Sequence, residues 1–165
     1  MSEDAEALYI LAAQVGSALS RAGLKLAIAE SCTGGWVAEC VTDVAGSSGW
    51  FDRGFVAYSN EAKQDLLGVS PVTLAVHGAV SEATVREMAG GALAGSRAQV
   101  AVAVSGIAGP AGGSPEKPVG TVWFAWQRAG GESVTRLERF EGDRREVRRQ
   151  AVAVALRGVL EMIGG

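Results

Sequence analysis

Residues Leu24 to Gly35 read Leu-Lys-Leu-Ala-Ile-Ala-Glu-Ser-Cys-Thr-Gly-Gly, and this stretch decides the core of the fold. The apolar run that ends at Ala29 predicts a buried strand, and apolar residues at helical spacing begin at Trp36. Hydroxyl groups at the joint lie beside the unsatisfied N–H groups of a helix N-terminus, where negative charge is favoured. Ser31 is suited there to act as a nucleophile that creates an oxyanion, or to hold a phosphate. The simpler alternative is that Ser31 or Thr33 only caps the helix.

Outside this stretch, expected helices and strands alternate along the chain. The helices are expected over residues 4–22, 35–44, 60–67, 81–96 and 143–163, and the strands over 25–29, 50–58, 99–104, 119–128 and 133–140. The last two strands flank a Gly-Gly turn and predict a hairpin, while four glycines and three prolines make residues 106–118 a loop. This pattern predicts an α/β fold, a three-layer α/β/α sandwich with a mixed sheet, formed as a single domain by residues 1–165.

Composition disfavours several classes of protein. A formal net charge of -3 and a pI of about 5.2 argue against a nucleic-acid partner, which needs a broad basic surface. No apolar run is as long as a membrane span, and the acidic N-terminus is unlike a secretory signal, so we expect a cytoplasmic protein without a membrane partner. Eight helical residues would place Cys32 and Cys40 about 12 Å apart, too far for a disulfide, so we expect two buried thiols.

The chain offers few groups for metal or histidine chemistry. Its single histidine, His77, and its two cysteines have no partners at zinc-type spacing, so neither a metal nor another cofactor is expected. His77 lies in an apolar segment, residues 76–80, that resembles a strand or loop before a helix, and we expect a packed or capping histidine there. A Ser-His-Asp triad is therefore disfavoured.

Lysine is rare in this sequence, which has three lysines and twelve arginines. Arginine cannot lose its proton in a protein, whereas a desolvated lysine can act as a base. Lys63 follows a predicted core strand that ends at Tyr58, and strand ends converge at one sheet edge, so both residues can face Ser31. A serine activated by a neutral lysine is one form of the serine nucleophile. The alternative is a solvent-facing lysine paired with Glu61 or Asp65.

The loop Ser105–Pro115 follows a core strand and can contact a ligand. Its glycines allow the backbone to approach a ligand closely, and a purely structural connection explains the same pattern equally well. No Gly-Lys-Ser/Thr follows these glycines, so the loop is not a P-loop.

Four arginines crowd the first two turns of the last predicted helix, where the helix dipole repels cations. They are Arg144, Arg145, Arg148 and Arg149. Two explanations are open. The arginines form a solvated face, or an anion compensates them, and this anion is Glu141, Glu146 or a bound phosphate.

Taken together, these segments resemble one protein family over nearly the whole chain. The matching stretches are Ala29–Gly35, Tyr58–Lys63, Gly78–Ser81, Ser105–Pro110, Lys117–Val122 and Gly142–Arg144 with Arg148. They are similar to the amidohydrolase domain of the CinA family, whose stand-alone members are nicotinamide-nucleotide amidohydrolases of the PncC type. The resemblance implies a cytoplasmic bacterial enzyme with a three-layer α/β fold, which deamidates nicotinamide mononucleotide to nicotinate mononucleotide and ammonia. It also implies a small-molecule nucleotide as the substrate and a homodimer.

The resemblance further implies a role for each matching residue. Ser31 is the expected nucleophile and Lys63 its general base, with Tyr58 as a proton relay or substrate contact. The expected backbone donors at the oxyanion are Thr33, Gly34 and Gly35. The other expected substrate-binding residues are Ser105, Gly106 and Gly109 in the loop, and Arg145 or a neighbouring arginine at the phosphate.

Two other functions compete with this one. A metal-dependent nucleotide phosphohydrolase would use the Gly-rich loop with Asp52, Glu61 and Asp65, although these acids form no tight cluster in the sequence. A regulatory module that binds a nucleotide without catalysis would keep the pocket and would need neither Ser31 nor Lys63.

Overall fold

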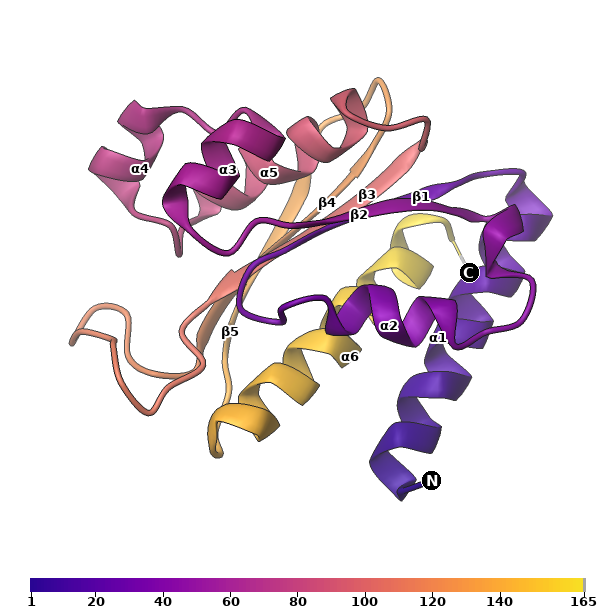
Figure 1. Ribbon diagram of the computed structural model, residues 1–165, viewed down its shortest axis with the longest axis horizontal. Helices are drawn as coiled ribbons and strands as arrows, with labels where there is room; N and C mark the ends of the chain where they lie inside the picture. Colours follow the sequence, from indigo (N-terminus) through magenta and orange to yellow (C-terminus); the bar gives the residue numbers. More distant parts are fainter. Residues whose placement is uncertain (165) are drawn as a thin grey trace.

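Five strands form one mixed sheet in the computed structural model, which describes residues 1–164 (Figure 1). The strands are β1 (Leu26–Glu30), β2 (Phe51–Val56), β3 (Val100–Gly106), β4 (Thr121–Arg128) and β5 (Val134–Arg139). In the order β2-β1-β3-β4-β5, β1 is parallel to both of its neighbours, and β4 and β5 continue the sheet as an antiparallel hairpin. Glu30 at the end of β1 lies opposite Val56 of β2 and Val104 of β3. The carboxyl ends of the three parallel strands therefore meet at one edge, where α/β sheets bind ligands.

Helices cover both faces of the sheet, so the predicted three-layer sandwich is confirmed (Figure 1). One layer holds α1 (Glu3–Ala22), α2 (Trp36–Thr42) and α6 (Arg144–Met162), and the other holds α3 (Asn60–Leu67), α4 (Pro71–His77) and α5 (Glu82–Ala94). Strand β3 is buried on both faces: Val102 and Val104 pack in the core of the first layer, and Ala103 packs in the core of the second. This explains why its sequence is a continuous apolar run without polar alternation.

A short helix, α4, includes His77, which was expected to lie in a strand or loop over residues 76–80. Ser70 is its N-cap and Pro71 lies in its first turn, a position that suits proline. His77 ends the helix with its side chain exposed, and its carbonyl oxygen accepts a hydrogen bond from Lys117 Nζ at 2.7 Å. The prediction of a packed or capping histidine is wrong because α4 buries Leu74 and turns His77 to solvent.

Helix α3 lies close against α5, and a glycine allows this contact. A Cβ atom at Gly91 would lie 2.7 Å from the carbonyl carbon of Leu67 and 2.9 Å from its Cα, both shorter than an ordinary carbon contact. The neighbouring Gly90 has more room, since a Cβ there would lie 3.7 Å from Gln127 Oε1, its nearest atom. Lys63 is one turn before Leu67 in α3, so a change in the α3–α5 distance at Gly91 would also move the segment that carries Lys63.

Candidate active site

The structure brings Ser31 and Lys63 into direct contact. Ser31 follows the last residue of β1, Lys63 lies on α3, and Lys63 Nζ is 2.9 Å from Ser31 Oγ. Both side chains are buried, and Lys63 is only 1% exposed. The alternative of a solvent-facing lysine is therefore wrong. So is the alternative of a capping Ser31, because the N-cap of α2 is Gly35 and makes no side-chain hydrogen bond.

The surroundings of Lys63 favour its neutral form. Its Nζ donates to the carbonyl oxygens of Ala57 at 3.1 Å and Tyr58 at 3.0 Å, and no ion pair involves Lys63 among residues 1–164. Burial without a counter-ion lowers the pKa of Lys63. A neutral amine has two N–H bonds and one lone pair. When the two carbonyls hold the N–H bonds, the lone pair faces Ser31 Oγ and can accept its proton.

The neighbouring thiol is not suited to replace the serine. Cys32 is buried, and burial raises its pKa to about 12, so the thiol stays protonated near neutral pH. Cys40 is also a buried free thiol with a pKa raised to about 12 by burial. The prediction of two buried, unpaired cysteines is confirmed.

Glu30 closes the turn that carries Ser31, and the sequence analysis missed it. Its Oε1 accepts the Thr33 hydroxyl at 2.6 Å and the Val37 N–H at 2.9 Å, and its Oε2 accepts the Ala38 N–H at 3.0 Å. These helix N–H groups are therefore occupied and do not face a substrate. The signal in the sequence was an acidic residue at the end of an apolar strand, directly before a Gly-containing turn.

The three residues expected at the oxyanion lie in this same turn. The Gly34 N–H donates to the Ser31 carbonyl at 3.0 Å, so the turn itself uses that donor. Thr33 is fully buried, and none of Thr33, Gly34 and Gly35 lines the cavity beside Ser31. The backbone donors of Thr33 and Gly35 remain predictions. Cys32, the residue that follows Ser31, does line the cavity.

A cavity of about 290 Å³ opens beside the Ser31–Lys63 pair. Four of the predicted site residues line it together with the pair: Tyr58, Ser105, Gly106 and Gly109. The Ser105 hydroxyl donates to the Ala79 carbonyl at 2.8 Å, which ties the loop after β3 to the residues before α5. Segments from five distant parts of the chain thus meet around one opening, and Tyr58 and Lys63 face Ser31 there, as the convergence of strand ends predicted.

Of the four arginines in the first two turns of α6, only Arg144 lines this cavity. Its guanidinium donates to the Gly109 carbonyl at 2.8 Å and to the Tyr58 hydroxyl at 3.2 Å. Arg145, the arginine named from the sequence, lies apart from the cavity, with its guanidinium 4.3 Å from the centre of the Trp36 ring. The arginine at the opening is thus the neighbouring Arg144 and not Arg145.

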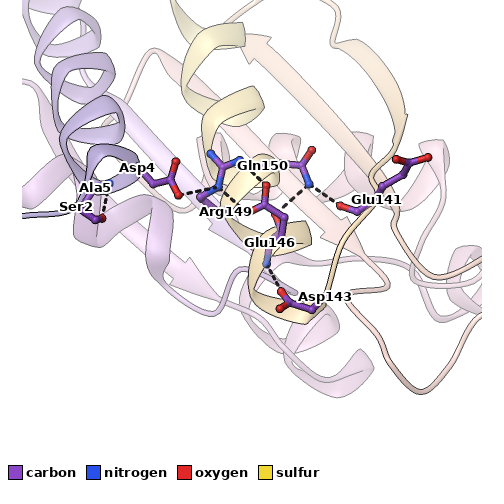
Figure 2. Close-up of polar contacts among 8 residues, drawn as sticks. All are labelled: Ser2, Asp4, Ala5, Glu141, Asp143, Glu146, Arg149 and Gln150. Atoms are coloured by element: carbon purple, nitrogen blue, oxygen red, sulfur yellow. Dashed lines mark hydrogen bonds and ion pairs between the residues drawn. The ribbon is translucent and has the colours of Figure 1, made fainter.

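The other two arginines have partners within the protein. Arg148 donates to the carbonyls of Cys32 and Thr33, both at 3.0 Å, and so holds the outer side of the Ser31 turn. Figure 2 shows Arg149 between Glu146, at 2.6 Å, and Asp4, at 3.9 Å. Glu146 is thus the compensating anion for Arg149, and Arg144 is the one of these four arginines that lies at the cavity.

Neither a metal-binding cluster of His, Cys, Asp or Glu side chains nor a membrane-spanning helix is found among the described residues. Among residues 1–164, no three or more His, Cys, Asp or Glu side chains are grouped so that they could hold a metal. The acids Asp52, Glu61 and Asp65, considered for a phosphohydrolase, do not line the cavity. Over the same residues, none of the helices has the length and apolarity needed to cross a bilayer.

Comparison with known proteins gives a consistent result. A model of the CinA C-terminal domain matches residues 8–163. The chain is 64% identical over 149 residues to the nicotinamide-nucleotide amidohydrolase PncC of Escherichia coli (strain K12), with 90% of each chain covered. It is 51% identical over 152 residues to the protein of the same name from Pseudomonas putida, covering 92% of this chain and 94% of that one. The crystal structure of competence/damage inducible protein CihA from Agrobacterium tumefaciens, 44% identical, superposes with a TM-score of 0.93 over 100% of this chain and 98% of that one.

Proposed function

The chain belongs to the CinA C-terminal domain family, and we propose that it is a bacterial nicotinamide-nucleotide amidohydrolase, a hydrolase that converts nicotinamide mononucleotide to nicotinate mononucleotide and ammonia. Relatives that are 64% and 51% identical over nine-tenths of the chain carry this name. The observation that carries the proposal is the 2.9 Å contact between Ser31 and a buried Lys63 without a counter-ion.

In the proposed first step, Lys63 accepts the hydroxyl proton as Ser31 Oγ attacks the carboxamide carbon. The carbonyl oxygen becomes an oxyanion, for which the N–H groups of Thr33 and Gly35 are candidate donors together with that of Cys32, which follows the nucleophile. The protonated Lys63 then gives its proton to the amide nitrogen, ammonia leaves, and Ser31 is left as an acyl ester. Water attacks this ester with Lys63 again as base, which releases the carboxylate and restores the serine.

The rest of the cavity is proposed to bind the nucleotide. Arg144 offers a fixed positive charge at the opening, where it can bind the phosphate monoester in forked geometry. Tyr58 shares a hydrogen bond with Arg144 and lies next to the pair, which suits a substrate contact. The proposed contacts along the loop after β3 are Ser105, Gly106 and Gly109. The resemblance alone supports two further parts of the proposal, a homodimer and a cytoplasmic location.

The alternative functions would leave the pair unexplained. Burial of a lysine without a counter-ion costs free energy, and binding of a nucleotide without catalysis does not require such a lysine.

The test is ammonia release from nicotinamide mononucleotide by the wild type, by Ser31→Ala and by Cys32→Ala, each also after dialysis against a chelator. We expect an active wild type, an active Cys32→Ala and a folded, inactive Ser31→Ala, all insensitive to the chelator. A fully active Ser31→Ala would refute the nucleophile, and a loss restored by one divalent ion would favour the phosphohydrolase.

A further inference from the structure

Glu30 is a buried acidic residue that the proposed reaction does not use directly. It is 1% exposed, ends β1 and immediately precedes Ser31. Its two carboxylate oxygens accept three hydrogen bonds, one from the Thr33 hydroxyl and two from N–H groups in the first turn of α2. These contacts span the whole turn from the end of the strand to the start of the helix.

We infer that Glu30 is a positioning residue, whose carboxylate holds the turn 31–35 so that Ser31 Oγ faces Lys63. The inference rests on the proposed function, in which Ser31 is the nucleophile. The N-cap residue cannot supply a side-chain hydrogen bond to the start of α2, because it is Gly35, at φ +101° and without a side chain. Arg148 binds carbonyls of the turn from its outer side, so Glu30 and Arg148 hold it from two sides.

The main chain of Glu30 also connects to the base. Its carbonyl oxygen accepts the Ala57 N–H at 2.8 Å, and the Ala57 carbonyl in turn accepts Lys63 Nζ at 3.1 Å. The side chain of Glu30 therefore fixes the segment that carries the nucleophile, and its main chain fixes the segment that holds the base. A change in the side chain disturbs the first of these links and leaves the second in place.

A carboxylate is the group that these three donors require. Glutamine at position 30 can keep the bonds of its carbonyl oxygen to Thr33 and Val37, but its amide nitrogen would place a donor against the Ala38 N–H. The turn must then shift to relieve that donor–donor contact. Misplacement of a reacting group by about 1 Å costs about 100-fold in rate. Arg144 and the loop after β3, which are proposed to bind the nucleotide, lie outside this turn, so KM should change far less than kcat.

Glu87 provides a matched control in the other helical layer. Its carboxylate accepts the Ser70 N–H at 2.8 Å and the Thr73 hydroxyl at 2.5 Å. It therefore hydrogen-bonds to the start of α4, as Glu30 hydrogen-bonds to the start of α2. It does not line the cavity beside Ser31. Glutamine there can accept the Ser70 N–H and donate to the Thr73 hydroxyl oxygen, so Glu87→Gln removes a carboxylate charge outside the site and should keep the wild-type kcat.

The experiment compares wild type, Glu30→Gln and Glu87→Gln in two assays. One measures kcat and KM for ammonia release from nicotinamide mononucleotide, and the other measures the rate at which a fluorophosphonate probe labels Ser31, read by mass spectrometry. We expect Glu30→Gln to lose about 100-fold in kcat and a comparable factor in labelling, with KM within about threefold of wild type. A Glu30→Gln protein within threefold of Glu87→Gln in both assays would overturn the inference.

Two further outcomes are informative. If Glu30→Gln does not fold, Thr33→Val removes a single bond to the carboxylate, and we expect it to lose about tenfold in kcat at unchanged KM. A normal kcat in Thr33→Val then overturns the inference. A wild-type protein that releases no ammonia from nicotinamide mononucleotide refutes the proposed function, whereas slow labelling of Glu30→Gln beside fast labelling of wild type still supports the role of Glu30.

Discussion

A methyl group at Gly91, far along the chain from both Ser31 and Lys63, should inactivate the enzyme. In the native structure a Cβ at this position would lie 2.7 Å from the carbonyl carbon of Leu67. Carbon atoms pack at about 3.5 Å or more, so α3 must move away from α5 by about 0.8 Å or more in Gly91→Ala. Lys63 is on the same helix as Leu67, and its Nζ would leave the 2.9 Å contact with Ser31 Oγ.

The expected effect follows from that displacement. A shift of about 1 Å in a reacting group costs about 100-fold in rate, and overpacking of the α3–α5 contact should cost about 1–3 kcal/mol of the unfolding free energy. Gly90→Ala is the matched control on the same helix, since its Cβ meets Gln127 Oε1 at an ordinary 3.7 Å. Alanine has the higher helix propensity, so Gly90→Ala should be as stable as wild type or more so, with full activity.

The assay is kcat for ammonia release from nicotinamide mononucleotide at a temperature where circular dichroism shows each variant to be folded. Thermal unfolding of Gly90→Ala and Gly91→Ala provides the stability comparison. The reasoning would be refuted if folded Gly91→Ala turned over within about threefold of Gly90→Ala, since a displaced Lys63 could not then be part of the reaction.

Three other predictions concern charges in the cavity. Lys63→Arg keeps the positive charge but cannot accept a proton, so kcat should fall about 100- to 10,000-fold, and near-normal turnover would show that only the charge matters. In the wild type, kcat/KM should rise with pH until Lys63 has lost its proton, because burial holds the pKa of Lys63 in the folded protein below the ordinary 10.5. Between the folded-state pKa and the ordinary value, the unfolded chain binds more protons than the folded one. The stability of wild type relative to Lys63→Met should therefore rise with pH across that window. Arg144→Ala should weaken the preference for nicotinamide mononucleotide over its nucleoside by about 10- to 100-fold, whereas Arg149→Ala, whose guanidinium pairs with Glu146, should keep that preference; equal preference in both variants would place the phosphate elsewhere.

Local spacing in the sequence was sufficient for most of the secondary structure. The helix predicted over residues 60–67 has those bounds in the structure, and the continuous Val/Ala run near Val102 is a strand covered on both faces. These features depend on neighbours within a few residues, so a linear pattern records them. Helix α4 was missed because it is only seven residues long and rich in β-branched side chains, although Ser70 before Pro71 was a start signal.

The sequence by itself also singled out Ser31 and Lys63, one by its place at a strand-to-helix joint and the other by the rarity of lysine. It could not decide whether Lys63 was exposed or buried, because that depends on the packing of α3 against α5 and the sheet. Nor could it choose between Arg144 and Arg145, since adjacent residues on a helix point about 100° apart and the rotation of α6 is set by the residues it buries against the sheet. Hydrophobic spacing is a local property, whereas the direction of a side chain toward a cavity is decided by contacts between segments far apart in the chain.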